Sequence, residues 1–298
     1  MVIFTSNRPL SRAENLKSVY DSYDGEKRFE QLGVSILSGD VQVTDELPIY
    51  PTLKKCIFIG HGMGACKTYG LDQPYPFFRR ERSSMLTYCI ASSKHMIPIV
   101  AKQCGISVSQ VIPAGMPRTD AYFADREKNR EHKRYLYAPT YRDGIWTPDW
   151  RRIERALPDG CELIVKPHML TGGLLNRNYK NIREASSQEP TTPYLLDCDA
   201  LITDYSSLMF DAMVIRTHVV LYANDRYRYL RDRGMYYPYP SAYSDSFAET
   251  EEELVEMLGR AEWTDKDEER KEFFTGSCDG HSVERVLEMI ESLKRQEA

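Results

Sequence analysis

The chain of 298 residues contains no long apolar run, no closely paired cysteines and no excess of positive charge. Its apolar segments fall well short of the ~20 residues that a transmembrane helix needs, and residues 1–4 lack the basic and apolar regions of a signal peptide. The chain has 39 lysines and arginines against 44 aspartates and glutamates, a net charge of −5. An overall negative charge argues against nucleic-acid binding by general electrostatic attraction. We therefore expect a cytoplasmic protein that binds no nucleic acid, and peripheral attachment to the inner face of the membrane stays open.

The absence of paired cysteines and of metal-ligand clusters excludes several classes of disulfide-linked and metal-binding proteins. The seven cysteines are odd in number and irregularly spaced, and no Cys-x-x-Cys pair occurs, so neither a disulfide scaffold nor a zinc ribbon is expected. No histidine–carboxylate cluster has the spacing of metal ligands, which predicts no tightly bound metal or cofactor. A divalent ion that binds only together with a ligand is compatible with this prediction.

Short apolar runs alternate with helical patterns along the whole chain. Hydrophobic residues make up 42 % and charged residues 28 %, as in an average soluble domain. The alternation is typical of βαβ units with a parallel sheet. The predicted strands are residues 2–4, 34–37, 56–59, 87–91, 111–113, 135–138, 163–165, 200–203 and 219–222. The predicted helices are residues 15–23, 94–104, 150–157, 206–215 and 282–296, and a capping box at Thr250 opens another.

The alternation occurs as two successive series, and the length fits two domains of ~150 residues. We place the boundary at the charged segment that begins at residue 125. The sequence thus predicts two Rossmann-like lobes, residues 1–124 and 125–298, with the last helix either staying in the second lobe or packing back on the first. In such α/β folds ligands bind beyond the carboxyl ends of the strands.

The most informative segment is residues 199–211, where an apolar strand runs into polar residues and then into a helix. Thr203 and Asp204 end the strand, and Ser206 and Ser207 precede the helix, which also carries Asp211. Free N–H groups, the helix dipole and two hydroxyls can bind a phosphate there. Ordinary helix capping is the commoner role of such residues, and it stays open.

A second segment, residues 59–64, places His61 between two glycines after an apolar strand. An imidazole with a pKa near ~6.5 suits a general base that takes a proton from an attacking hydroxyl. The alternative is a loop histidine whose flanking glycines serve only the turn. We favour the base, because the position lies at the predicted edge of the cleft.

Basic and hydroxyl side chains follow other predicted strands. Lys166 and His168 can hold a diphosphate or protonate a leaving phosphate. Thr140 and Arg142 offer a hydroxyl and a fork of donors for the same group. The alternatives are a solvated basic loop and a surface ion pair of Arg142 with its neighbour. The turn that contains Arg118 has the same two interpretations.

Two further features favour structural roles. Asp197 and Asp199 resemble an Asp-x-Asp metal motif, but they precede a strand instead of ending one, so we interpret Asp199 as structural. A dense group of tyrosines can form either a sugar-stacking or membrane-edge surface or ordinary loop packing; it comprises Tyr236, Tyr237, Tyr239 and Tyr243.

Taken together, the motifs resemble the CDP-glycerol glycerophosphotransferase family of teichoic acid primases and polymerases, over nearly the whole chain. The matching blocks occur in the family's order: Ser6 with residues 15–20, His61-Gly62 with Lys67 and Gly70, Gly115-x-Pro-Arg-x-Asp120, Ala138-Pro-Thr-x-Arg142, residues 199–211, Asp225 with Tyr229, Arg233-Gly234 and Tyr236, and Asp279-Gly280-x-Ser282-x-x-Arg285. Two blocks depart from the family pattern. His61-Gly-Met-Gly64 stands where the family has His-Gly-Thr-Pro, and Lys166-Pro-His168 stands where it has Lys-x-His-Pro.

The resemblance implies a GT-B-like fold with two lobes facing a central cleft. It implies a CDP-activated polyol donor, CDP-glycerol or CDP-ribitol, whose polyol phosphate is transferred to a hydroxyl of a glycan or lipid-linked polymer with release of CMP. By carry-over, His61 is the general base and His168 lies beside the donor diphosphate. The acceptor side holds Gly62, Lys67 and Arg118. The donor side holds Thr140, Arg142, Lys166, Thr203, Asp204, Ser206, Ser207 and Asp211.

Other classes of function remain open at this point. A GT-B glycosyltransferase that uses a nucleotide sugar would share the fold and the phosphate site, since a fold does not determine a function. A non-catalytic homologue that binds a nucleotide or glycan would keep the cleft without turnover, and an assembly subunit at the membrane is a further alternative. The sequence identifies neither the acceptor, the polyol nor the oligomeric state.

Overall fold

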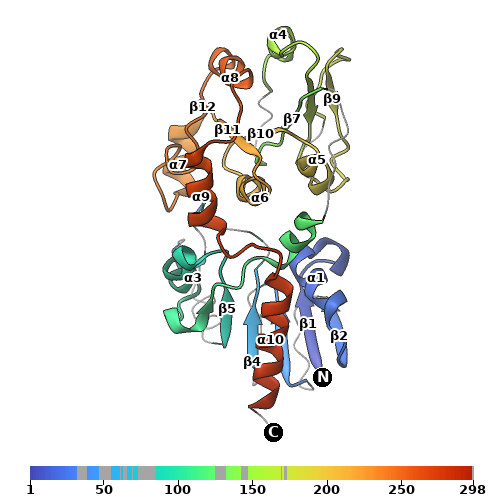
Figure 1. Ribbon diagram of the computed structural model, residues 1–298, viewed down its shortest axis with the longest axis vertical. Helices are drawn as coiled ribbons and strands as arrows, with labels where there is room; N and C mark the ends of the chain where they lie inside the picture. Colours follow the sequence, from blue (N-terminus) through green and yellow to red (C-terminus); the bar gives the residue numbers. More distant parts are fainter. Residues whose placement is uncertain are drawn as a thin grey trace. The chain divides into compact units, whose positions relative to one another are not determined.

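The structure, a computed structural model, divides the chain into two compact units (Figure 1). Unit 1 comprises Met1–Ala124 together with Glu272–Ala298, and unit 2 comprises Asp125–Lys271. The residues that the structure describes are 1–31, 39–46, 55–60, 62, 66–68, 70–72, 85–124, 132–141, 147–168, 170 and 173–296. The predicted second lobe differs from unit 2 over residues 272–298, which group with unit 1.

Unit 1 is built on a parallel sheet whose described strands follow the order β2-β1-β3-β4-β5-β6. Every pairing between neighbours in this order is parallel. The strands are β1 (Val2–Ser6), β2 (Lys27–Gln31), β3 (Val41–Thr44), β4 (Lys55–Phe58), β5 (Tyr88–Ile90) and β6 (Val111–Ile112). Strands β1 and β3 are buried along their whole length, whereas β2, at the sheet edge, is half-buried.

Helices pack on this sheet, and the last of them explains why the chain's end belongs to unit 1. Helix α10 (Ser282–Arg295) buries Val286, Ile290 and Leu293 and contacts α1, η5 and β3; Figure 1 shows it running alongside β4. The other helical segments are η1 (Leu10–Arg12), α1 (Glu14–Ser22), η2 (Gly70–Asp72), η3 (Lys94–Met96), α3 (Ile97–Cys104), η4 (Val108–Gln110) and η5 (Pro117–Phe123).

Unit 2 repeats the architecture with the strand order β12-β11-β10-β7-β8-β9, again parallel throughout. The strands are β7 (Arg134–Tyr137), β8 (Glu162–Val165), β9 (Ile182–Glu184), β10 (Ala200–Thr203), β11 (His218–Tyr222) and β12 (Phe247–Ala248). The central strand β10 is fully buried and pairs with β7 on one side and β11 on the other. This order places the carboxyl ends of β7, β8, β10 and β11 along one edge of the sheet.

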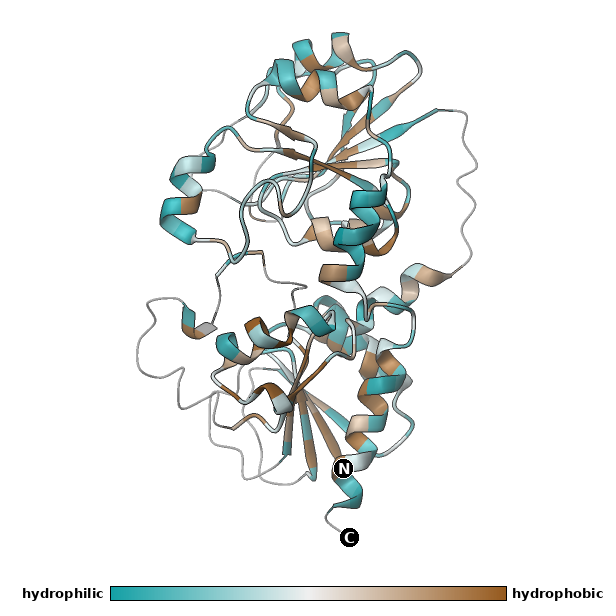
Figure 2. Ribbon diagram, turned by 60° about the vertical axis from the view of Figure 1, so that its left-hand side comes forward, coloured by the Kyte–Doolittle hydropathy of each residue, from teal (hydrophilic) through white to brown (hydrophobic). Residues whose placement is uncertain are grey.

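The helices of unit 2 cover a core of apolar side chains from these strands. The ribbon of the strands is largely brown, that is hydrophobic, in Figure 2. Trp150 on α4 and Leu254 and Leu258 on α8 are buried in that core. The helices are α4 (Trp150–Ala156), α5 (Thr192–Leu196), α6 (Leu208–Val214), α7 (Arg226–Arg233), α8 (Glu251–Leu258) and α9 (Asp265–Thr275). No helix among the described residues is long and apolar enough to cross a membrane.

Helix α9 runs from unit 2 into unit 1, and a buried polar network anchors its first turn. His218, at the start of β11, places Nδ1 2.8 Å from Asp267 Oδ2 and Nε2 2.8 Å from Ser246 Oγ. Burial alone would raise the pKa of Asp267, but the hydrogen bond and charge of His218, together with hydrogen bonds from Thr264, outweigh it and lower that pKa. The network holds α9 to the sheet of unit 2 and lies apart from the predicted site residues in the sequence.

Most of the predicted elements are confirmed, with small changes at their ends. The predicted helix 94–104 is in fact η3 followed by α3, because Pro98 lacks an N–H group and fits only the first turn of an α-helix. The predicted helix 206–215 begins only at Leu208. The capping box of Thr250 with Glu253 is confirmed. The predicted strand 34–37 lies outside the described residues, and β2, β3, β9 and β12 were not predicted.

Candidate functional site

The predicted donor residues of unit 2 follow three neighbouring strands. In the sheet register Tyr137 of β7 lies beside both Ile202 of β10 and Val165 of β8. Thr140 and Lys166 therefore come after strands that end beside each other, and Thr203 is the last residue of the neighbouring strand β10. The structure thus brings the donor residues that it describes to one edge of the sheet, whereas Arg142 lies outside the described residues.

Asp204 organises the loop at this edge. Its Oδ1 accepts hydrogen bonds from the backbone N–H of Thr140 (2.8 Å) and of Tyr205 (2.6 Å), and its side chain is buried. Thr203 Oγ1 donates to the carbonyl of Ala138 at 2.6 Å. Both side chains thus tie the turn after β7 to the turn after β10. These contacts support a positioning role for Thr203 and Asp204.

The two serines before α6 differ from each other. Ser206 Oγ accepts a hydrogen bond from the N–H of Leu208 (3.3 Å), which is ordinary capping. Ser207 is the residue before the first helical position, yet its side chain makes no capping bond. Ser207 therefore keeps a half-buried hydroxyl that can bind a ligand at the start of α6. Asp211 is only 3 % exposed, within α6.

Lys166 carries a buried ammonium group directly after β8. The residue is 3 % exposed, and Nζ donates to the carbonyl of Pro167 at 3.4 Å. Desolvation lowers the pKa of Lys166, against a smaller opposing effect of the charge on Glu189. No carboxylate of the described residues lies within ion-pair distance of Nζ. A buried cation without a paired anion is costly, so this position favours an anionic ligand.

Thr140 and His168 add further donors at the same sheet edge. The Oγ1 of Thr140 is buried and has no hydrogen-bond partner among the described residues. His168 Nδ1 accepts from the N–H of Leu170 at 3.2 Å, so in the neutral ring the proton is on Nε2. The His168 ring is half-buried, 5.6 Å from the ring centre of Tyr141. With Ser207 and Lys166, these groups can donate hydrogen bonds to phosphate oxygens.

In unit 1, His61 lies outside the described residues, but its flanking glycines are described. Gly60 has a φ of +60°, a conformation that favours glycine. Gly62 is exposed and has room for a larger side chain. Lys67 is half-buried nearby in the sequence. The Arg118 side chain is 10 % exposed, with Nε 4.0 Å from Glu14 Oε2.

Sequence reasoning gave no role to Asn15, although it connects two predicted acceptor-side segments. Its Nδ2 donates to the carbonyl of Gly60 (3.1 Å), and its Oδ1 accepts from the backbone N–H of Arg118 (3.1 Å). Asn15 is 2 % exposed on the apolar face of α1. The signal in the sequence was a polar residue on the buried stripe of a helix. Asn15 holds the residue before His61 next to the segment of Arg118.

We expect Asn15→Leu to destabilise the protein by about 2–4 kcal/mol, because two buried backbone groups lose their partner. Urea unfolding measures this change. Ser18→Ala on the same helix is the matched control, since Ser18 is half-buried and its hydroxyl donates to the carbonyl of Glu14 within the helix. A loss for Asn15→Leu no larger than that of Ser18→Ala would contradict the assigned role.

Two blocks that resemble family motifs hold the scaffold together. Asp120 accepts hydrogen bonds from the N–H groups of Ser282 (3.1 Å) and Val283 (2.7 Å), which begin α10. Arg285 Nη1 donates to the carbonyl of Ala114 at 3.2 Å. Gly115 has a φ of +82°, and a Cβ atom there would lie 2.2 Å from the carbonyl oxygen of Ser277. These residues join η5 to α10 and have no described part in the predicted site.

The predicted structural role of Asp199 agrees with its contact, because its Oδ2 accepts from the N–H of Arg134 at 2.8 Å. The tyrosines after α7 pack in the loop: Tyr243 is fully buried, and Tyr239 donates to the carbonyl of Asp204 at 3.3 Å. No group of three or more potential metal ligands occurs in the described part of the chain.

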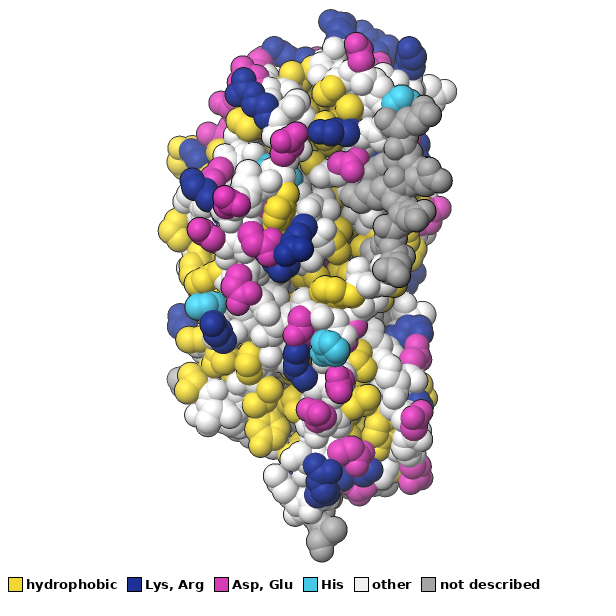
Figure 3. Space-filling model, viewed as in Figure 1, with side chains coloured by type: hydrophobic (Ala, Val, Ile, Leu, Met, Phe, Trp, Pro, Cys, Tyr) yellow, Lys and Arg dark blue, Asp and Glu magenta, His cyan; other side chains and the backbone are white. Residues whose placement is uncertain are grey.

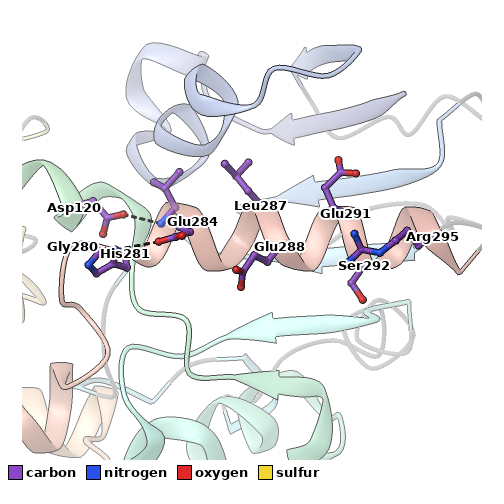
Figure 4. Close-up of a pocket in the computed structure, with 10 residues that line it drawn as sticks. Asp120, Gly280, His281, Glu284, Leu287, Glu288, Glu291, Ser292 and Arg295 are labelled. Atoms are coloured by element: carbon purple, nitrogen blue, oxygen red, sulfur yellow. Dashed lines mark hydrogen bonds and ion pairs between the residues drawn. The ribbon is translucent and has the colours of Figure 1, made fainter.

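A groove of about 900 Å³ lies along α10 in unit 1, and Asp120 of η5 also lines it. Figure 4 shows Glu284, Glu288 and Glu291 projecting from the helix around Leu287. Figure 3 shows acidic side chains along the same helix. Acidic side chains of this kind suit neither a diphosphate nor a polyanionic chain, so the groove is not the candidate site.

A family model described as CDP-Glycerol:Poly(glycerophosphate) glycerophosphotransferase matches residues 44–292. The chain belongs to this family. The glycerophosphotransferase family resemblance predicted from the motifs is therefore confirmed. The match spans both units, and it includes the donor-side residues at the sheet edge of unit 2 as well as Gly62, Lys67 and Arg118 of unit 1.

Curated relatives in this glycerophosphotransferase family include enzymes of teichoic acid synthesis. The chain is 26 % identical over 284 residues to a teichoic acid poly(ribitol-phosphate) polymerase of Bacillus spizizenii, covering 83 % of this chain and 46 % of that protein. It is 26 % identical over 261 residues to a teichoic acid glycerol-phosphate primase of Bacillus subtilis, covering 80 % and 68 %. The chain thus spans less than half of the first relative's length.

Solved structures agree with the fold. The wall teichoic acid polymerase TagF superposes with a TM-score of 0.81 at 18 % identity, covering 99 % of this chain and 89 % of that one. A UDP-N-acetylglucosamine 2-epimerase from Listeria monocytogenes gives a TM-score of 0.65 at 12 % identity, covering 99 % and 96 %. At such identities the likeness shows the fold alone. The predicted GT-B-like fold with two Rossmann-like lobes is confirmed.

Proposed function

We propose that the chain transfers a polyol phosphate, glycerol phosphate from CDP-glycerol in the first place, to a hydroxyl group of a teichoic-acid-like acceptor. The acceptor oxygen forms a bond to the phosphorus that carries the glycerol. The bond between this phosphorus and the oxygen bridging to the cytidine phosphate breaks, and CMP leaves with that electron pair. The proton of the acceptor hydroxyl passes to His61. Glycerol phosphate and ribitol phosphate differ only in the polyol, so CDP-ribitol is an alternative donor.

The observation that carries this proposal is a set of hydrogen-bond donors, at the carboxyl edge of the unit 2 sheet, that are not fully used by the described residues. Lys166 offers a buried ammonium, Thr140 a buried hydroxyl without a described partner, and Ser207 a hydroxyl that makes no capping bond. A diphosphate supplies the acceptor oxygens that these groups need. Phosphoryl transfer depends mainly on positioning and on stabilising the charge of the leaving group.

The proposal assigns two tasks to two units. His168 Nε2–H and Lys166 stabilise the developing charge on CMP, together with Arg142. His61 acts as the base for the acceptor hydroxyl, with Gly62, Lys67 and Arg118 on the acceptor side. The partners are then a CDP-polyol and a glycan or lipid-linked polymer, met at the cytoplasmic face of a membrane. No metal or other cofactor is part of the proposal.

Cytidine ligands are expected to stabilise the protein selectively against heat. A ligand at 100 times its Kd adds about 2.7 kcal/mol to the free energy of unfolding, which raises Tm by several degrees. The panel is CMP, CDP-glycerol, CDP-ribitol, UMP and UDP-glucose, followed by CMP release from whichever CDP donor binds, with teichoic acid primer as acceptor.

Selective stabilisation by CDP-glycerol or CDP-ribitol supports the donor assignment, and acceptor-dependent CMP release supports the transfer. Selective stabilisation by UMP and UDP-glucose would overturn the proposal in favour of a nucleotide-sugar glycosyltransferase. Donor binding without CMP release across glycan and polymer acceptors would instead indicate a non-catalytic binding protein.

A further inference from the structure

Helix α7, labelled in Figure 1, presents an exposed basic face. It contains four arginines and one aspartate, and none of its residues is buried. Tyr227 is 75 % exposed, and the side chains of Arg228 and Arg231 are 79 % and 74 % exposed. Positions 227, 228 and 231 lie on one side of the helix, since residues three and four apart are neighbours.

The guanidinium groups on this face use little of their hydrogen-bonding capacity. Arg231 Nε donates to Asp232 Oδ1 at 2.8 Å, and Arg228 Nε lies 3.9 Å from Asp232 Oδ2. A single exposed carboxylate therefore serves two arginines, each of which has five N–H donors. Arg226, by contrast, is engaged: its Nε lies 3.1 Å from Glu249 Oε1, and its guanidinium lies over the ring of Phe247. Its Nη2 also donates to the Tyr227 hydroxyl at 2.6 Å, so this hydroxyl accepts one hydrogen bond and keeps its own proton to donate. Tyr227, Arg228 and Arg231 form what we call the α7 face.

The α7 face is fixed to the candidate donor site by Tyr205, which stands between Asp204 and Ser206. Tyr205 is fully buried, and its ring stacks on that of Tyr229 with centroids 3.7 Å apart. Its hydroxyl donates to Asp225 Oδ1 at 2.8 Å, just before α7 begins. The donor loop and the helix are thus held in one rigid arrangement at the same sheet edge.

We propose that the α7 face binds the phosphodiester backbone of the growing polymer acceptor. The inference rests on the proposed function, because a polyol-phosphate acceptor is a chain of anionic phosphodiesters. Arginine forks match phosphate oxygens, and the exposed tyrosine adds a hydroxyl donor beside them. The contact retains the polymer near the donor loop without depending on the polyol.

The side chains of the α7 face fit a soluble polyanion better than a membrane surface. A helix that inserts into a membrane interface needs a broad apolar face, whereas here the inward side carries Tyr229 and Leu230, both half-buried in the protein. What remains exposed is Arg228, Arg231, Tyr227 and the carboxylate of Asp232, with no exposed aliphatic side chain on the helix. Such a surface binds phosphates by charge and hydrogen bonds alone.

The test measures binding of fluorescent poly(glycerol phosphate) by anisotropy at several salt concentrations, without donor. Arg228→Gln with Arg231→Gln is expected to weaken binding about tenfold and to reduce the salt dependence by ~1–2 units of log Kd against log salt. Asp232→Asn removes the competing carboxylate and is expected to tighten binding about threefold. The matched control is Arg151→Gln with Arg155→Gln on α4, where both arginines are exposed.

Weakening by the α7 pair, tightening by Asp232→Asn and no change in the α4 pair would support the inference. Equal affinities in all variants, or no binding of the polymer by the unmodified protein, would overturn it. If the α7 substitutions weakened binding only to phosphatidylglycerol vesicles and not to the polymer, the inference would also be overturned, because the face would then bind a membrane. Thermal stabilisation by CDP-glycerol, measured on the same variants, tests the donor site separately. Failure of the proposed function is thereby distinguished from failure of the α7 inference.

Discussion

Replacing His61 with alanine is expected to lower the rate of CMP release by about 10²- to 10⁴-fold, while CMP and CDP-glycerol bind almost as before. The acceptor hydroxyl must lose its proton as it attacks, and alanine cannot accept it. The donor diphosphate, by contrast, is proposed to bind at the sheet edge of unit 2, among Lys166, Thr140 and Ser207. Removal of a base in unit 1 therefore affects kcat and leaves donor affinity intact.

Two measurements separate these effects: single-turnover CMP release with saturating donor, and Tm shifts with CDP-glycerol. His281→Ala is the matched control, because His281 is an exposed histidine of unit 1 whose Nδ1 lies 3.1 Å from Glu284 Oε2. A His61→Ala protein that loses donor binding and turnover together would show that His61 belongs to the donor site. Unchanged turnover would exclude it as the base.

The fold was predictable because its central strands are short apolar runs and its helices carry apolar stripes. Strands β1, β4, β7, β8, β10 and β11 all contain such runs and were found. Strand β2 was not, since Lys27–Gln31 lies at a sheet edge, is half-buried and has a polar sequence. Strand β12 has only two residues, too few for a periodic pattern. Edge strands depend on pairing with a neighbour, which the local sequence does not encode.

The sequence predicted where the candidate site residues lie better than it predicted the separate role of each residue. A strand followed by Thr203, Asp204, Ser206 and Ser207 indicated a loop at the end of β10. The pattern could not separate Ser206, which caps α6, from Ser207, which does not. Nor could it show that Asp204 binds the backbone of the turn after β7, because that contact joins residues distant in the sequence.

Family-like motifs mix residues of the scaffold with residues of the site. Asp120, Ser282 and Arg285 lie in two such blocks, and their contacts join η5 to α10. Asp279 and Arg285 pair with each other, which lowers the pKa of Asp279 against the effect of burial. Contacts, and not the motif match, therefore distinguish Lys166, whose charge has no described counterion, from these paired groups.

Lys166→Met is expected to change stability and donor affinity in opposite directions. Removing a buried, unpaired ammonium and keeping an unbranched apolar chain should raise the free energy of unfolding by about 1 kcal/mol. Losing the cation that meets the diphosphate should weaken CDP-glycerol binding about 10²-fold, or about 3 kcal/mol. Urea unfolding and isothermal titration of CDP-glycerol measure the two effects. Lys180→Met, at an exposed lysine of unit 2, is the matched control and should change neither.

The pH dependence of stability and of donor binding tests the role of Lys166 independently, because the direction of each change can be predicted. Desolvation lowers the pKa of Lys166 below its ordinary value of 10.5, so the unfolded chain binds the proton more readily than the folded protein. The contribution of Lys166 to stability therefore rises with pH between the lowered pKa and 10.5. A bound diphosphate favours the charged lysine and raises that pKa again, so donor affinity should fall as pH increases through this window. In Lys166→Met this slope should be absent. A variant that is destabilised, or one that keeps both the affinity and the slope, would show that Lys166 is a structural lysine and that the donor diphosphate binds elsewhere.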